Sequence, residues 1–243
     1  MTIETYENKY LPNEEIAKIE RMISEDEKDM RLKGHFIQFS GLIYKNFKKE
    51  TNMISEVPKN FQEWFKFIAI DPGIDNPCAA TWIGMNRDMR FPQYCIYDDY
   101  YESDKTIEEN VSNIVQINGG DKIQAIILDP WAGRQRTAIN GLTTYDEFNK
   151  AFRKHSNNKL WLKRINTYDK FAQISKIRQL LNFNDIYGKT ALTITENCYA
   201  VIKEICRYRY QTQRDKNKNL SEKPQKVFDH TMNCIESFFS INP

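Results

Sequence analysis

Apolar positions recur with two different periods along the sequence, and each period predicts one type of element. Residues 13–32 carry apolar side chains at helical spacing among many charges, which predicts an amphipathic helix. Residues 34–47 predict a short strand or hairpin. Three apolar segments with turn-like joins follow, "FKFIAID" at 65–71, "CAATWIGM" at 78–85 and "QYCIYDDYY" at 93–101, and they predict an antiparallel meander.

From residue 106 onward, helical and strand periods alternate. Helices are predicted at 106–117, 143–154, 169–183 and 227–239, with a further one starting at 197, and strands at 122–129, 160–165 and 191–195. The run at 122–129 is almost continuously apolar near its end, which is typical of a strand buried on both faces. This order predicts an α/β domain with a mixed sheet flanked by helices, antiparallel at first and parallel after the first crossover.

The composition is that of an ordinary globular chain. Its 243 residues suffice for one sizeable core with an appended segment, and the formal net charge of +2 says little about partners. No apolar run is long enough to span a bilayer, and the start lacks the pattern of a signal peptide, so we expect a cytoplasmic protein without a membrane partner. The five cysteines form no CxxC pair, which favours buried small side chains over disulfides or a zinc site.

Three acidic residues occupy special positions in this order of elements. Asp71 and Asp129 each end an apolar strand and precede a proline, and Asp229 lies at the start of the last predicted helix. If the two strands are parallel neighbours, both carboxylates lie at the carboxyl edge of the sheet, where open α/β sheets bind ligands. One turn of helix would direct Asp229 to the same edge.

Three neighbouring carboxylates repel one another, and hard divalent cations relieve this repulsion. Oxygen ligands suit Mg²⁺ and Mn²⁺, and two such ions roughly 4 Å apart hold the attacking and leaving oxygens of a phosphodiester. The spacing therefore predicts a metal-dependent phosphoryl-transfer site. Each acid alone also has a structural explanation, because Asp-Pro pairs are typical of turns and an Asp at a helix start is typical of an N-cap.

The segments around these acids resemble the C-terminal nuclease part of the large terminase subunit of tailed bacteriophages. They are "AIDPGIDNPCAATWIG" with Asp71, "AIILDPWAG" with Asp129 and "KVFDHTMNCIESF" with Asp229. "GHFIQFSGLIYKNF" is similar to the segment that joins the ATPase and nuclease domains in that family, and the residues before it resemble the end of the ATPase region. The resemblance implies a linker segment at 1–60 and a ribonuclease-H-like nuclease domain at 61–243.

The same resemblance implies an endonuclease that cuts double-stranded DNA during viral genome packaging. Asp71, Asp129 and Asp229 would be its catalytic and metal-binding residues, holding two divalent cations, Mg²⁺ or Mn²⁺, with Asp71 bridging both. The implied partners, besides DNA, are the terminase ATPase region, the small terminase subunit and the portal of the capsid. The implied location is the cytoplasm of the infected bacterial host.

Two features depart from the family pattern. The family often has an Asp four residues after the third acid, where this sequence has Asn233, so one metal contact is in doubt. The sequence also has no GxxxxGK[ST] stretch, the loop that cradles phosphates in the ATPase. We therefore expect the nuclease half without its own motor.

Basic residues cluster before the third acid. Residues 203–226 contain eight Lys or Arg against three acids, and "RYRYQ" would place its two arginines on one face of a strand. Such a hairpin can bind the DNA backbone without reading bases, or can be an ordinary solvated hairpin. The candidate DNA-binding residues are Arg134, Arg136, Arg207, Arg209, Lys216, Lys218 and Lys223. His230 and Asp75 could support the acids, although packing and turn capping explain them equally well.

Two other functions are compatible with the sequence. "IDPGIDNPCAATWIG" faintly resembles the first phosphate loop of actin-like ATPases and sugar kinases, but the place of their second glycine-rich loop reads "LDPWAGRQR", with one Gly. A non-catalytic packaging or docking module on the same fold is the other alternative. Nucleotide binding would favour the first and loss of a metal ligand the second.

Overall fold

The computed structural model describes residues 41–73, 77–135, 141–157, 159–211 and 223–241. All the helices and strands given below belong to one compact unit, Leu42–Pro243. The helix predicted at 13–32 and most of the strand predicted at 34–47 lie outside the described residues, as do the candidate site residues Asp75, Arg136, Lys216 and Lys218.

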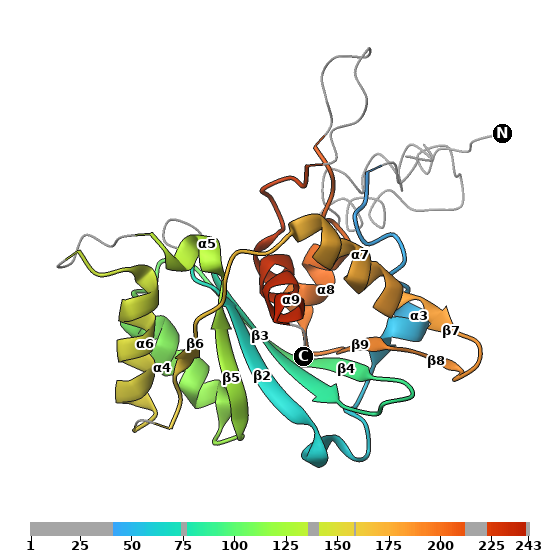
Figure 1. The fold of residues 1–243 in the computed structure, drawn as a ribbon, viewed down its shortest axis with the longest axis horizontal. Coiled ribbons are helices and arrows are strands. Elements are labelled where there is room, and N and C mark those ends of the chain that lie inside the picture. The colour runs from blue at the N-terminus through green and yellow to red at the C-terminus, as the bar shows by residue number, and fades with distance from the viewer. Residues whose placement is uncertain (1–40, 74–76, 136–140, 158, 212–222, 242–243) are drawn as a thin grey trace, which may run out of the picture. The chain divides into compact units, whose positions relative to one another are not determined.

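A seven-stranded mixed sheet forms the centre of this unit (Figure 1). Its strands, in spatial order, are β1 (Met53–Ile54), β9 (Leu192–Thr195), β4 (Gln93–Glu102), β3 (Cys78–Asn86), β2 (Phe65–Asp71), β5 (Ile123–Leu128) and β6 (Leu162–Lys163). The pairs β2–β3 and β3–β4 are antiparallel, whereas β5, β6, β9 and β1 each join in parallel. The predicted change from an antiparallel meander to parallel pairing is confirmed.

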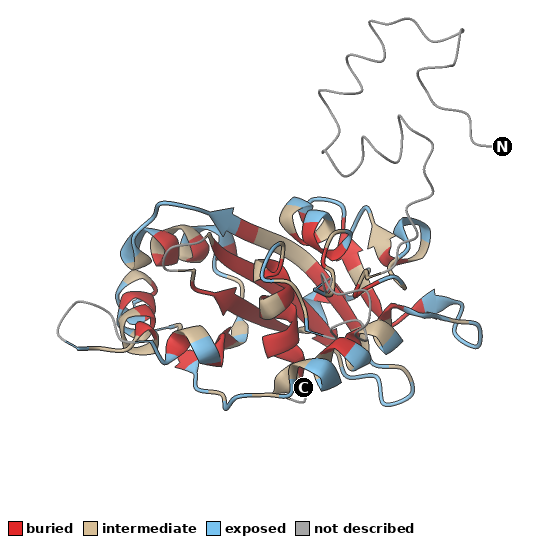
Figure 2. Cartoon of the chain, turned by 90° about the horizontal axis from the view of Figure 1, so that it is seen from above, coloured by how far each residue is buried: buried red, intermediate tan, exposed pale blue. Residues whose placement is uncertain are grey.

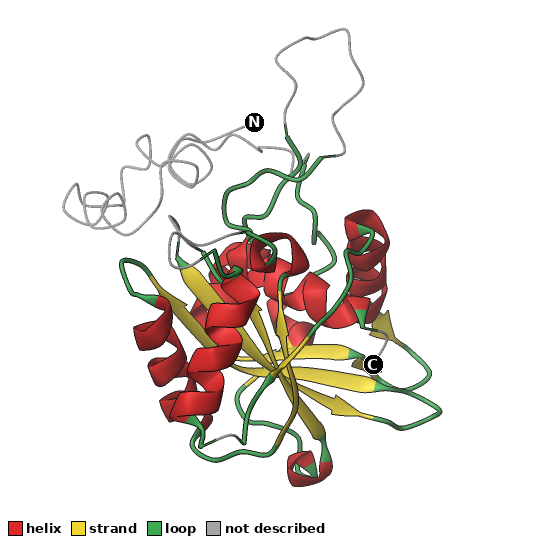
Figure 3. Cartoon of the chain, turned by 60° about the vertical axis from the view of Figure 1, so that its left-hand side comes forward, coloured by secondary structure: helices red, strands yellow, loops and turns green. Residues whose placement is uncertain are grey.

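Helices cover both faces of the sheet (Figure 3). One face packs against α4 (Ile107–Asn118) and α6 (Thr144–His155), and the other against α7 (Lys170–Leu181), α8 (Tyr199–Ile205) and α9 (His230–Ser240). Smaller elements are α3 (Lys49–Asn52), η2 (Phe61–Glu63), α5 (Pro130–Gly133) and the two-stranded pair β7 (Phe183–Asn184) and β8 (Lys189–Thr190).

Local sequence signals explain where the helices begin and end. Thr106 starts α4 through a capping box with Glu109, in which each side chain bonds the other residue's backbone N–H. Thr143 starts α6 in the same way. Gly119 ends α4 with φ of 57°, a left-handed conformation that costs glycine least.

The strands are buried on both faces, as the red colouring of the sheet in Figure 2 shows. Along β2, Phe67 and Ala69 pack in the cluster with α7, α8 and α9, whereas Ile68 and Ile70 pack in the cluster with α4 and α6. Successive side chains of a strand point to opposite faces. This alternation later decides where the acid at the end of β2 points.

Residues 42–60 belong to the same compact unit as the sheet, although the expected domain boundary lies after residue 60. Ile43 and Tyr44 are buried in the core, and the fully buried Asn52 donates to the carbonyls of Leu181 and Leu192. The segment is therefore part of the fold, and its relation to an ATPase region stays a prediction.

Two smaller expectations have outcomes here. Cys78, Cys95, Cys198 and Cys234 are buried as expected, whereas Cys206 is exposed, and none is in a disulfide. Among the described residues, no helix is both long and apolar enough to cross a bilayer.

Candidate active site

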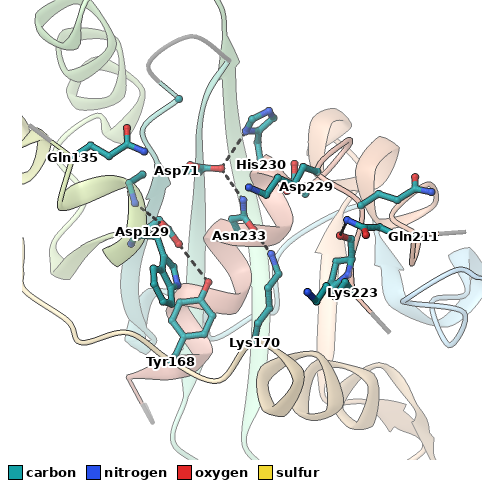
Figure 4. A pocket seen from close by; sticks show the side chains of 16 residues that line it. Asp71, Asp129, Gln135, Tyr168, Lys170, Gln211, Lys223, Asp229, His230 and Asn233 are labelled. Atoms are coloured by element: carbon teal, nitrogen blue, oxygen red, sulfur yellow. Dashed lines mark hydrogen bonds and ion pairs between the residues drawn. The ribbon is translucent and has the colours of Figure 1, made fainter. Parts of the chain in front are cut away.

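The three predicted acids line one cavity of about 660 Å³ at the carboxyl edge of the sheet (Figure 4). Asp71 ends β2, Asp129 follows β5, and Asp229 is the N-cap of α9. Because β2 and β5 are parallel neighbours with Ile70 opposite Leu128, the first two acids come out of the sheet side by side.

Strand alternation directs these two side chains to the same face. Phe67 and Ala69 of β2 and Ile127 of β5 all pack on the α9 side of the sheet. Asp71 and Asp129 lie two residues further along their strands and therefore point to the α9 side as well. The acids are only 7% and 6% exposed, so water solvates them poorly.

Asp71 is held by two side chains from the first turn of α9. Its Oδ2 accepts hydrogen bonds from His230 Nδ1 at 3.1 Å and from Asn233 Nδ2 at 3.0 Å. Figure 4 shows both donors on the side of Asp71 that faces Asp229, whereas Asp129 lies on the other side. His230, predicted to support the acids, therefore contacts Asp71 directly.

Asp129 combines a structural role with its place in the cavity. Its Oδ1 accepts from the backbone N–H groups of Trp131 and Ala132, both at 3.0 Å, and so caps the short helix α5. Its Oδ2 accepts from Ser237 Oγ at 3.2 Å and more weakly from Tyr168 Oη at 3.4 Å. The turn-forming explanation is thus partly right, while the second oxygen faces the cavity residues.

Asp229 does not cap its own helix, although it occupies the N-cap position. Glu204 of α8 does so instead, because its Oε2 accepts from the backbone N–H of Thr231 at 2.7 Å and from the Thr231 hydroxyl at 2.5 Å. A buried carboxylate from another helix thus satisfies the start of α9, which leaves the Asp229 carboxylate for the cavity.

A lysine stands beside the acids and is held from behind. Lys170, the first residue of α7, donates from Nζ to Asn233 Oδ1 at 2.6 Å and pairs with Glu236 Oε2 at 3.2 Å. The other oxygen of Glu236 accepts from Tyr44 Oη at 2.9 Å. The Lys170 ammonium also lies 5.7 Å from the centre of the Tyr208 ring, a cation–π contact.

The electrostatics indicate crowded, poorly solvated carboxylates. Burial is the main cause that raises the pKa of Asp129, and the Asp71 charge raises it further. Burial likewise raises the pKa of Asp229, while Lys170 and His230 act in the opposite direction. The hydrogen bond to Asp71 raises the pKa of His230 and outweighs the effect of burial. A cation in the cavity would relieve the repulsion between the acids.

The chemistry of these donors fits a hard divalent cation, because carboxylate oxygens are the ligands that Mg²⁺ and Mn²⁺ prefer. Within the described part of the chain, however, no group of three or more His, Cys, Asp or Glu side chains is arranged to hold one ion. A cation bound here would therefore take fewer than three of these side chains as direct ligands.

The predicted DNA-binding residues are dispersed. Lys223 lines the cavity, and its backbone pairs with Gln211 at the base of the predicted hairpin, with a separation of 2.8 Å. Arg207 lies 5.4 Å above the ring of Phe228, and Arg209 pairs with Leu42 in an isolated bridge. Arg134 lines a neighbouring cavity behind α5.

Several residues of the site were not predicted from the sequence. Tyr168 and Lys170 follow β6, the next parallel strand after β5, at the same sheet edge, so their position in the order of elements was a usable signal. Glu236 and Ser237 lie at helical spacing from Asp229 and Asn233 and share one stripe of α9. Glu204 gave no signal, because its role depends on how α8 packs against α9.

Comparison with known proteins places this arrangement in a known fold. No protein-family model and no curated protein matches the sequence. Among solved structures, the large terminase nuclease domain of P22 matches with a TM-score of 0.61 and 17% identity over 84% of this chain and 93% of that one. The large terminase nuclease domain of bacteriophage SPP1, solved with bound Mn, matches with a TM-score of 0.53 and 12% identity over 82% and 98%.

A whole large terminase from a thermophilic bacteriophage matches with a TM-score of 0.58 and 17% identity over 97% of this chain. The present chain spans about half the length of that protein, 54%. At these identities the likeness concerns the fold. Over most of its length, the chain has the ribonuclease-H-like α/β fold of large terminase nuclease domains from phages.

Proposed function

We propose that this chain is a metal-dependent endonuclease that cuts double-stranded DNA during viral genome packaging. The observation that carries the proposal is the convergence of Asp71, Asp129 and Asp229, from three separate elements, on one open cavity. The terminase nuclease fold supports the same function, since the SPP1 relative was solved with bound Mn.

In this proposal Asp71, Asp129 and Asp229 carry the negative charge that attracts Mg²⁺ or Mn²⁺. When bound, the cation would supply Lewis-acid stabilisation for a phosphodiester under attack by water. The chain's own residues fix the geometry, because His230 and Asn233 hold Asp71 while Ser237 and two backbone N–H groups orient Asp129.

The DNA backbone would reach the acids along the base of the basic hairpin. Gln211, Lys223 and Lys226 lie at the hairpin's base and line the same cavity as the acids. Cationic and amide side chains in this position can bind phosphates without reading bases. Arg134, Arg207 and Arg209 stay candidates for contacts further from the cavity.

The proposed biological setting follows the fold. The nuclease would act with the terminase ATPase region, the small terminase subunit and the capsid portal, in the cytoplasm of an infected bacterial host. These partners are proposals that rest on the likeness to the large terminases.

A plasmid-nicking assay tests the enzymatic proposal. Supercoiled plasmid incubated with the protein should become nicked and linear with Mn²⁺ or Mg²⁺, and should stay intact with a chelator. Plasmid that stays intact with ample protein and Mn²⁺ would refute the assignment.

A further inference from the structure

The side of Asp71 that faces Asp229 is filled by side chains of the chain itself. Asp71 Oδ2 already accepts two hydrogen bonds there, from His230 and from Asn233. A carboxylate oxygen has two lone pairs, so these bonds use the accepting capacity of Oδ2. A cation between Asp71 and Asp229 would have to displace one of the donors.

The orientation of the Asn233 amide is fixed by Lys170. An ammonium group only donates hydrogen bonds, so the Asn233 oxygen must face Lys170 Nζ, 2.6 Å away. The amide nitrogen then necessarily faces Asp71. Turning the amide oxygen toward a metal would place two donors, the NH₂ group and the ammonium, against each other. Asn233 therefore serves as a donor to Asp71, and Lys170 prevents it from serving as a metal ligand.

Lys170 itself is not free to leave. Glu236 is fully buried, and Lys170 is its cationic partner at 3.2 Å. Glu236 is also bonded to Tyr44 of the core. Moving the ammonium away would strand a buried carboxylate without its counter-charge, which strongly destabilises a folded chain. The positive charge beside the acids is therefore a permanent part of the fold.

We infer that Lys170 and Asn233 take the place of a second cation beside Asp71, so that the site binds a single divalent ion, between Asp71 and Asp129. Lys170 is thus a positioning residue that contributes a fixed positive charge. This inference rests on the proposed metal-dependent nuclease and departs from the two ions that the sequence resemblance implies. Figure 4 shows Asn233 and the end of Lys170 on the Asp229 side of Asp71, with the Asp129 side left to the ion.

Isothermal titration calorimetry with Mn²⁺ measures the number of bound ions directly. The wild-type chain should bind one Mn²⁺, and the same preparation should cut plasmid at that ion concentration. Two bound ions together with cleavage would overturn this inference and leave the proposed function intact. Failure both to bind Mn²⁺ and to cut plasmid would overturn the proposed function, and this inference with it.

A combined variant tests the cause. Lys170→Met, Glu236→Gln and Asn233→Asp together remove the ammonium and its buried partner and add a carboxylate beside Asp71. Because both charges of the buried pair are removed, no unpaired ion is left in the core. The bound Mn²⁺ should rise from one ion to two.

Lys176→Met is the matched control. Lys176 lies on the same helix and also contacts α9, through the carbonyl of Phe239, but does not line the cavity. This control should still bind one ion. A folded combined variant that also binds only one ion would show that Lys170 and Asn233 do not exclude the second.

Discussion

Glu236 offers a sharp test of the buried ion pair behind the acid site. Burial raises the pKa of this carboxyl from 4.5 to about 7, even though Lys170 and Tyr44 favour its charged form. Between these two values the folded chain binds more protons than the unfolded chain, so the stabilisation present below pH 4.5 is lost as the pH rises to about 7. At about 1.4 kcal/mol per pH unit, the loss amounts to roughly 3 kcal/mol.

Glu236→Gln should remove this contribution. Chemical denaturation of both proteins at a series of pH values gives the difference in their free energies of unfolding, which cancels the effect of the other acids. The wild type should lose roughly 3 kcal/mol relative to the variant between pH 4.5 and about 7. Glu63→Gln, at an exposed glutamate, controls for the removal of an acid. A difference that does not vary with pH would refute the reasoning that burial dominates at Glu236.

Three further variants test other parts of the structure. Asp71→Asn should abolish Mn²⁺-dependent plasmid cleavage while circular dichroism shows an intact fold, and a variant that nicks at the normal rate excludes Asp71 from the site. Gly84→Ala places a Cβ 2.3 Å from Cε2 of the packed Phe61 ring, so denaturation should show a loss of about 1–3 kcal/mol, and unchanged stability means that the ring moves freely. Trp131 is 61% exposed in the cavity wall, so Trp131→Ala should weaken single-stranded oligonucleotide binding by about 1–3 kcal/mol in fluorescence anisotropy, whereas Trp161→Ala, 59% exposed outside that cavity, should not; equal effects would exclude base stacking on Trp131.

The regular parts of the fold were predictable because their signals are local. The antiparallel meander and the strand at 122–129 follow from apolar runs and turns. Short elements such as α3, β1 and the β7–β8 pair were missed, because two to four residues cannot show a period. The last helix starts at His230 and not at Val227, since Phe228 adopts φ of 56°, outside the helical region.

The acids were predictable for a related reason, and the residues around them were not. A strand's carboxyl end is visible in the sequence, so Asp71 and Asp129 could be assigned to one edge. Which face they point to depends on the phase of each strand relative to α9, which no single segment reveals. The Lys170–Asn233 contact joins residues 63 positions apart and depends on the packing of α7 against α9.

Asp229 shows most clearly how packing separates a structural acid from a functional one. Its sequence position fits an N-cap, and an N-cap aspartate would use its carboxylate on the first turn of its own helix. In this fold Glu204 satisfies that turn from α8, and it is buried at 2% exposure with Thr231 as its partner. A second buried carboxylate costs desolvation energy that capping by Asp229 itself would avoid. The arrangement is consistent with Asp229 being kept for the cavity, where Asp71 and Asp129 already converge.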